Sequence, residues 1–244
     1  MTADEAQSRK KDSEILAKRA AQVQRGGARA AVLGVNDGLV SILALILGVA
    51  AAGGDQKAVI IAAFAAIIAG AFSMAAGEWI SVKSQVDLFD GVLNDLKRMI
   101  KTDKALLQEN LAKHYVSDGY DNKTAIAATN EVSKNQDKFF QAYSEQVVGL
   151  NPDELGSPWV AAVSSFVLFV TGALAPMMPW FFVSGTTAII ISIVLTGIGG
   201  LLTGGYVAYS SGKSLIYGAL RQFLIILVVS AFTYGVGKLF GHVV

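Results

Sequence analysis

The chain has 244 residues and a formal net charge of +1, and 53% of its residues are hydrophobic while only 16% are charged. A soluble domain carries about 25% charged residues, so this composition predicts that much of the chain lies in a membrane. The nearly neutral charge excludes a strongly basic nucleic-acid binder. The lack of cysteine excludes disulfides, thiolate metal sites and cysteine nucleophiles.

The first 27 residues are charged and mildly amphipathic. They contain no apolar stretch before a small-residue cleavage site, so they are not a signal peptide. We expect a cytosolic tail or a helix that lies on the membrane surface and contacts lipid.

Five later segments are apolar and long enough to span a membrane as helices: 28–52, 58–82, 159–180, 186–209 and 215–240. The polar stretch between the second and third segments has apolar residues at helical spacing, and its clearest breaks are the runs at 118–121 and 150–153. We therefore predict an all-α membrane protein with a helical domain inserted between transmembrane helices two and three. Its parts are the tail (1–27), helices one and two (28–82), the helical domain (83–156) and helices three to five (157–244).

The distribution of lysine and arginine predicts the orientation. Seven basic residues lie in the N-terminal tail and at the start of the first span, and Lys213 and Arg221 lie in and just after the turn between spans four and five, on the same side. The opposite side has only Lys57 and Lys238. Since basic residues concentrate on the cytosolic side, we place the N-terminus and the helical domain in the cytosol. The protein then resides in the plasma membrane of a prokaryote or the vacuolar membrane of a eukaryote.

Asp37 lies among apolar residues inside the first span, about 12 Å beyond Arg29 at 1.5 Å per residue. An ionised carboxylate at such a depth costs roughly 2.5 kcal/mol or more, so it usually marks an ion or proton route. The alternative is a carboxylate that is protonated or satisfied by a neighbouring helix purely for packing.

Met74 and Glu78 follow on the second span, one helical turn apart and on one face. Together with Asp37 they offer two hard oxygen donors and one soft sulfur, which suits a late first-row divalent ion such as Fe²⁺ better than Mg²⁺ or Ca²⁺. Taken singly, Met74 is explained by core filling and Glu78 by an interfacial side chain that reaches the membrane surface. We predict that the three residues form a metal path.

Several motifs resemble those of the vacuolar iron transporter family: GVNDGLVS, AGAFSMAAGEWISVKSQ, LGSPWVAAVSSFVLFVTGALAPMMPW, SGKSLIYGALRQ and TYGVGKLFG. The resemblance implies a homodimer of five-helix protomers, with the ion path between the two copies of the first span. It also implies export of Fe²⁺, and often Mn²⁺, from the cytosol in exchange for protons, with no prosthetic group. The family's intramembrane aspartate, methionine and glutamate fall on Asp37, Met74 and Glu78.

Small residues four apart recur at Gly34/Gly38, Gly200/Gly204 and Gly237/Gly241, a spacing typical of closely packed membrane helices. In the implied dimer we expect Gly34 and Gly38 to allow close approach of the two first spans.

The sequence departs from the family in the helical domain. Positions where the family places metal-gathering glutamates and methionines carry other residues here: Leu96, Met99, Leu107, Asn110, Val147, Tyr143 and Ser144. Aliphatic side chains cannot ligate a metal ion, so we expect this domain not to bind metal in the family's way.

Two other classes of function compare with transport. An enzyme needs a nucleophile with a base, or a histidine-rich metal site, but the only histidines are His114 and His242, and we expect no enzymatic activity. A non-transporting membrane sensor or adaptor, whose helical domain binds a regulator, stays open as the alternative function. An anchor of that kind has no use for buried carboxylates, which favours transport. A channel rather than an exchanger also stays open.

Overall fold

The structure is a computed structural model that describes residues 27–151 and 156–241, and the elements in these two ranges are helices. The predicted N-terminal tail, apart from Gly27, lies outside the described residues. The described residues fall into two compact units. One unit, here called the helical unit, runs over Ser81–Ser157, and the other, the membrane unit, comprises Gly26–Ile80 and Pro158–Val244.

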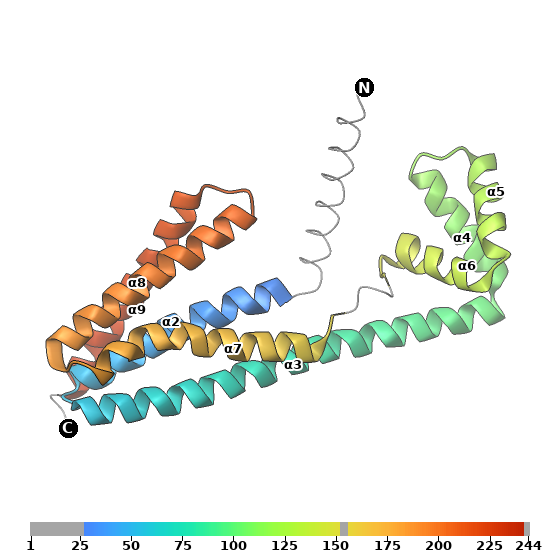
Figure 1. Cartoon of the computed structure of the whole chain (residues 1–244). Coiled ribbons are helices and arrows are strands. Elements are labelled where there is room, and N and C mark those ends of the chain that lie inside the picture. Colours follow the sequence, from blue (N-terminus) through green and yellow to red (C-terminus); the bar gives the residue numbers. More distant parts are fainter. Residues whose placement is uncertain (1–26, 152–155, 242–244) are drawn as a thin grey trace, which may run out of the picture. The chain divides into compact units, whose positions relative to one another are not determined.

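Five helices are long and apolar enough to cross a membrane, so an apolar helix of sufficient length occupies each of the five predicted spans. They are α2 (Gly27–Ala51), α3 (Gln56–Thr102), α7 (Pro158–Met177, extended by the 3₁₀ turn η3, Met178–Phe181), α8 (Gly185–Ser210) and α9 (Leu215–Gly241), all labelled in Figure 1 except η3.

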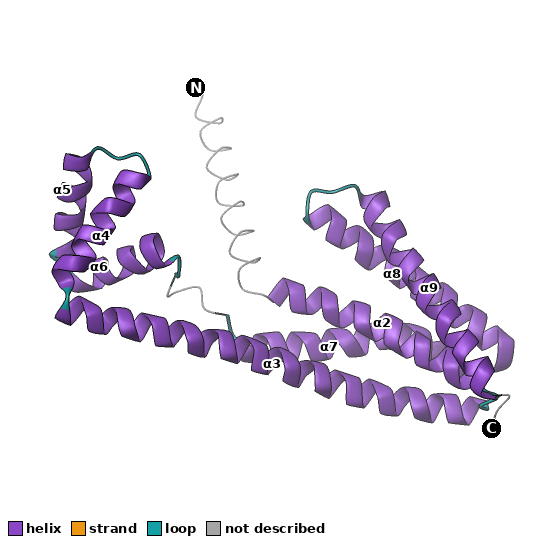
Figure 2. Ribbon diagram, turned by 180° about the vertical axis from the view of Figure 1, so that it is seen from behind, coloured by secondary structure: helices purple, strands orange, loops and turns teal. Residues whose placement is uncertain are grey.

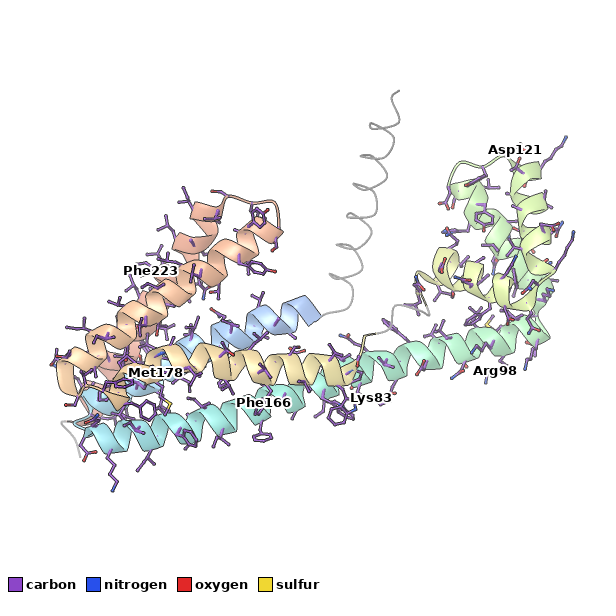
Figure 3. All side chains as sticks on the ribbon, in the orientation of Figure 1. Lys83, Arg98, Asp121, Phe166, Met178 and Phe223 are labelled. Carbon is purple, nitrogen blue, oxygen red and sulfur yellow. The ribbon has the colours of Figure 1, made fainter. Side chains whose placement is uncertain are left out.

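The second span differs from its prediction in length, because α3 does not end near Val82 but continues to Thr102. The change from apolar to charged residues alters what surrounds a helix without interrupting its backbone hydrogen bonds. Beyond the apolar part, the Lys83 ammonium binds the Asp87 carboxylate one turn later at 2.5 Å. Such i,i+4 pairs support an exposed helix, and Figure 3 labels Lys83 on this continuous stretch of α3.

The helical unit continues with α4 (Lys104–Ser117), α5 (Asn122–Ser133), α6 (Gln136–Tyr143) and the π-helical turn η1 (Ser144–Val148). The predicted break at 118–121 is confirmed between α4 and α5. Gly119 adopts φ +98° there. The Asp121 carboxylate then accepts hydrogen bonds from the backbone N–H groups of Lys123 and Thr124, which caps α5 (Figure 3). Of the second predicted break, only Leu150 and Asn151 lie within the described residues; they follow Gly149 at φ +75°.

An apolar core holds the helical unit together. Leu96 of α3, Leu107 of α4 and Phe139 of α6 are 4%, 1% and 0% exposed and belong to one cluster, against which Val147 packs. Leu96, Leu107 and Val147 stand at positions where the resemblance implies metal-gathering glutamates. Here Leu96 and Leu107 are core residues, and Val147 packs against that core.

Several acidic residues of the helical unit pair with basic residues on their own helices. The Arg98 guanidinium binds Asp95 at 2.8 Å, and the Lys113 ammonium binds Glu109 at 2.6 Å. The hydrogen bond from Lys113 lowers the pKa of the exposed Glu109 carboxyl. These pairs are typical of a solvated helix surface.

We expect Leu107→Ala to destabilise the helical unit by about 2–5 kcal/mol, because it removes a fully buried side chain and leaves a cavity. Leu106→Ala is the matched control, since its side chain is 51% exposed. Hydrogen exchange of the α4–α6 backbone amides in the full-length protein measures the effect. Equal protection in the two variants would contradict this assignment of the core.

In the membrane unit, α2 packs closely along α7, and α8 lies beside α9 (Figures 1 and 2). Ile42 of α2, Ile67 of α3 and Phe169 of α7 belong to one buried apolar cluster, here called the three-helix cluster. A second cluster joins Leu43 and Leu47 of α2 to Ile226 of α9. α2 thus packs against several helices of its own chain.

The glycine pairs all lie at helix contacts within the chain. Gly204 faces the backbone of α9 at Gly218, and Gly237 faces α2 at Gly48. Gly34 and Gly38 face α7, where a methyl group added to Gly34 would lie 2.8 Å from the carbonyl oxygen of Ser165. The expectation that Gly34 and Gly38 serve the contact between two first spans is therefore wrong. The spacing indicates close packing, but it does not say which helix packs there.

Candidate ion path in the membrane helices

Asp37 lies on α2, half-buried and ten residues into the helix. The Ser41 hydroxyl, one turn further along, donates a hydrogen bond to Oδ1 of the Asp37 carboxylate at 2.8 Å and also contacts the Asp37 carbonyl oxygen. Both partners belong to one helix, so this bond keeps the carboxylate at the surface of α2 without help from another span. The second carboxylate oxygen remains available to a ligand in this arrangement.

The position of Asp37 follows from what its neighbours contact. Gly38 faces α7, and Asn36 is hydrogen-bonded to α9 through Gln222. Successive residues of an α-helix point about 100° apart, so Asp37 lies between these two contacts. It shares its direction with Ser41 and with two apolar residues, Leu33, which is 42% exposed, and the half-buried Ala44. These four residues, at i, i+4, i+8 and i+11, are here called the Asp37 face.

Met74 lies on α3 and is half-buried against the three-helix cluster. The Met74 side chain therefore fills part of the apolar core, as the alternative explanation for this residue proposed. Gly70, one turn earlier, makes room for Phe169, because a methyl group added there would lie 2.5 Å from the ring. Met74 is thus next to a contact between α3 and α7.

Glu78 lies one turn beyond Met74 and is only 7% exposed. A side chain that reaches outward to the membrane surface would be more accessible than this, so burial favours an internal role over the interfacial alternative. The next residue, Trp79, stacks edge-on against Trp159 at the start of α7, with ring centroids 5.9 Å apart. This aromatic contact holds the Glu78 turn of α3 beside α7.

The structure does not gather the three predicted residues into a finished site. Asp37 is bonded to its own helix, while Met74 contacts an apolar cluster. Within residues 27–151 and 156–241, no group of three or more histidine, aspartate or glutamate side chains could hold a metal ion. Any ion at Asp37 therefore needs further ligands.

One pair of polar residues in the membrane unit was missed by the sequence analysis. The Gln222 amide of α9 donates a hydrogen bond to the Asn36 side-chain oxygen of α2, across 186 positions of the chain. The available signal was two carboxamides inside apolar spans, where polar side chains need a partner. Nothing in the sequence pairs one with the other.

The comparisons with known proteins agree with this architecture. The model of the VIT family matches residues 28–238, which extend over the helical unit and into all five spans. The chain belongs to the VIT family.

Individual relatives match over most of their own length. A protein of Acanthamoeba castellanii named "Vacuolar iron transporter" is 31% identical over 221 residues, 88% of this chain and 78% of that one. "Vacuolar iron transporter homolog 1" of Oryza sativa subsp. japonica is 32% identical over 87% of this chain and 73% of its own. "Vacuolar iron transporter homolog 1" of Arabidopsis thaliana is 31% identical, with 87% and 82% covered. VIT-family membership and five apolar helices make the chain an integral membrane protein.

Proposed function

We propose that this VIT-family protein transports divalent transition-metal ions, Fe²⁺ and also Mn²⁺, out of the cytosol in exchange for protons. The observation that carries the proposal is Asp37, which is half-buried, is the one acidic residue of α2 and lies on a face that the chain's own helices leave partly uncovered. Relatives named vacuolar iron transporters support iron as the cargo and fit a protein that is not an enzyme.

A homodimer would complete the ligand set. One carboxylate and one thioether are too few for Fe²⁺ or Mn²⁺, which take up to six ligands when bound by oxygen and nitrogen donors. A two-fold axis along the Asp37 face would bring two Asp37 carboxylates together and double the donors. Since Gly34 and Gly38 are engaged with α7, the Asp37 face is the part of α2 with room for a second copy.

Each predicted residue then has a chemical task. Asp37 supplies negative charge within the membrane, and Met74 adds a soft sulfur that favours Fe²⁺ over harder ions. Glu78, nearer the predicted cytosolic side, would receive the ion first. A carboxylate that binds either a metal ion or a proton is also what an exchanger requires, because the two cargoes then compete for one site.

The direction of transport rests on the predicted orientation. The N-terminal basic residues and the helical unit would face the cytosol, so an ion that enters beside Glu78 would pass Asp37 on its way out.

Transport into proteoliposomes tests the proposal directly. We expect purified protein to carry Fe²⁺ and Mn²⁺ faster than Zn²⁺, and an opposing proton gradient to accelerate uptake. Uptake that ignores the pH gradient would indicate a channel, and no uptake of any divalent ion would overturn the proposal.

Met74→Ala should slow Fe²⁺ transport more than Mn²⁺ transport, since the thioether contributes more to binding of the softer ion. The ratio of the two uptake rates is the measurement, because it cancels differences in protein insertion. Met178→Ala is the control, since that methionine is exposed in η3 (Figure 3). An unchanged ratio in Met74→Ala would remove Met74 from the path.

The second candidate function, a sensor or adaptor, is favoured by one observation. The helical unit has apolar core residues at Leu96 and Leu107, so it offers a packed fold rather than the family's metal ligands. The proteoliposome assay separates the two, because a sensor carries no ions.

A further inference from the structure

The side chain of Gln222 on α9 packs closely against the backbone of α8. A methyl group added to Gly204 of α8 would lie 2.7 Å from the Gln222 Cβ, and one added to Gly200 would lie 3.6 Å from its Cγ. These two glycines form the small-residue pair of α8. This packing holds the Cβ and Cγ atoms of Gln222 against α8 and limits the directions in which its amide can point.

The Gln222 amide extends from α9 to α2 and donates a hydrogen bond to the side-chain oxygen of Asn36. Both residues are half-buried in the membrane unit. In a membrane a carboxamide without a partner is costly, so the bond resists separation of the two helices and rotation of α2 about its axis.

The effect on Asp37 follows from the order of residues along α2. The backbone at Gly38 is fixed sterically against α7, and the side chain at Asn36 is fixed by its bond to α9. Asp37 lies between these two anchors. A rotation of α2 by about 100°, the step between successive residues, would turn its carboxylate toward one of the neighbouring helices.

We infer that Asn36 and Gln222 are positioning residues for transport, which fix the rotation of α2 so that the Asp37 carboxylate points along the Asp37 face toward the ion. This inference rests on the proposed function. The pair touches no ion itself and acts through the direction of Asp37. The loss of one interhelical hydrogen bond in a membrane shifts an equilibrium roughly 3- to 20-fold, which is enough to bias the rotation of α2.

The flux experiment uses full-length variants in proteoliposomes. Gln222→Met and Asn36→Leu each remove the bond with little change in volume, and we expect the apparent KM for Fe²⁺ to rise roughly 3- to 20-fold, the equivalent of one such bond. The double variant should be no worse than either single one. The reciprocal exchange, Asn36→Gln with Gln222→Asn, keeps one long and one short carboxamide and should restore the KM.

Thr233→Val is the matched control on α9, because the Thr233 hydroxyl is half-buried and donates only within its own helix, to Val229 and Ser230. It should leave the KM unchanged. The inference fails if Gln222→Met leaves the KM for Fe²⁺ as unchanged as Thr233→Val does. It also fails if the effects of Gln222→Met and Asn36→Leu on the KM add in the double variant.

A second measurement does not depend on transport. The chain has no cysteine, so Asp37→Cys provides a single thiol at the position in question. We expect Gln222→Met to change its reaction rate with a water-soluble thiol reagent about 3-fold or more, and Thr233→Val to leave it unchanged. If the wild-type protein carries no metal but the thiol rate responds to Gln222, the proposed function fails while the positioning of residue 37 stands. If Gln222→Met leaves the reaction rate of the thiol at position 37 unchanged, the inference is overturned even if metal transport is observed.

Discussion

Asp37→Asn should reduce metal flux to background while the protein still folds and inserts. The amide oxygen of asparagine can accept the same hydrogen bond from Ser41, so the local structure of α2 is kept. What is lost is the negative charge that offsets the desolvation of a divalent cation inside the membrane. Substituting groups that only support a metal ligand typically costs 10- to 100-fold, so removing the charged ligand itself should cost about 100-fold or more.

The measurement is the initial rate of Fe²⁺ uptake into proteoliposomes with equal amounts of inserted protein. Asp87→Asn is the control, since it makes the same chemical change on an exposed residue that pairs with Lys83 on the helical unit. Flux through Asp37→Asn at the wild-type rate would show that the ion does not pass this carboxylate. Such a result would leave Asp37 with the packing role that the sequence analysis kept open.

Disulfide crosslinking along α2 should produce covalent dimers from one face of the helix and none from the opposite face. With no native cysteine, each variant carries a single thiol. Leu33→Cys and Ala44→Cys lie on the Asp37 face, so in the proposed dimer each thiol approaches its counterpart across the two-fold axis. The effect is nearly all or none, because a disulfide requires Cα atoms within about 7 Å of each other.

Ile46→Cys is the control on the same helix, two residues beyond Ala44. Ile46 is fully buried in the three-helix cluster and should give no dimer band. Dimers from Ile46→Cys but not from Leu33→Cys would mean that a different face of α2 meets the partner. Absence of dimers from every position on α2 would exclude a shared path along this helix.

Because Gly34 and Gly38 pack against α7, they are poor positions for testing the dimer contact. A large side chain at Gly34 or Gly38 would disturb the packing of α2 on α7, and its effect on flux would reflect folding as much as assembly. Substitutions at Leu33 or Ala44 test the proposed dimer contact without disturbing that internal packing.

The sequence alone was enough to identify the five spans, the run at 118–121 as a helix break, and Asp37 as an unusual residue. Each of these depends on a local property. A span is a matter of apolar length, a break follows from Gly119 and the capping carboxylate of Asp121, and a charge inside an apolar segment is visible in the segment itself. The continuity of α3 beyond Val82 was missed because a change in polarity resembles a boundary although the helix hydrogen bonds do not respond to it.

Only the tertiary structure decided which helices meet. It assigned Gly34 and Gly38 to α7, placed Leu107 in the core of the helical unit, and joined Gln222 to Asn36. The physical reason is that small residues and carboxamides signal a close or polar contact without naming the partner, which lies up to 186 positions away and is selected by the packing of all the helices together. The chemistry of Asp37 could therefore be seen in the sequence, whereas the direction in which its carboxylate points depends on the helices on either side of α2.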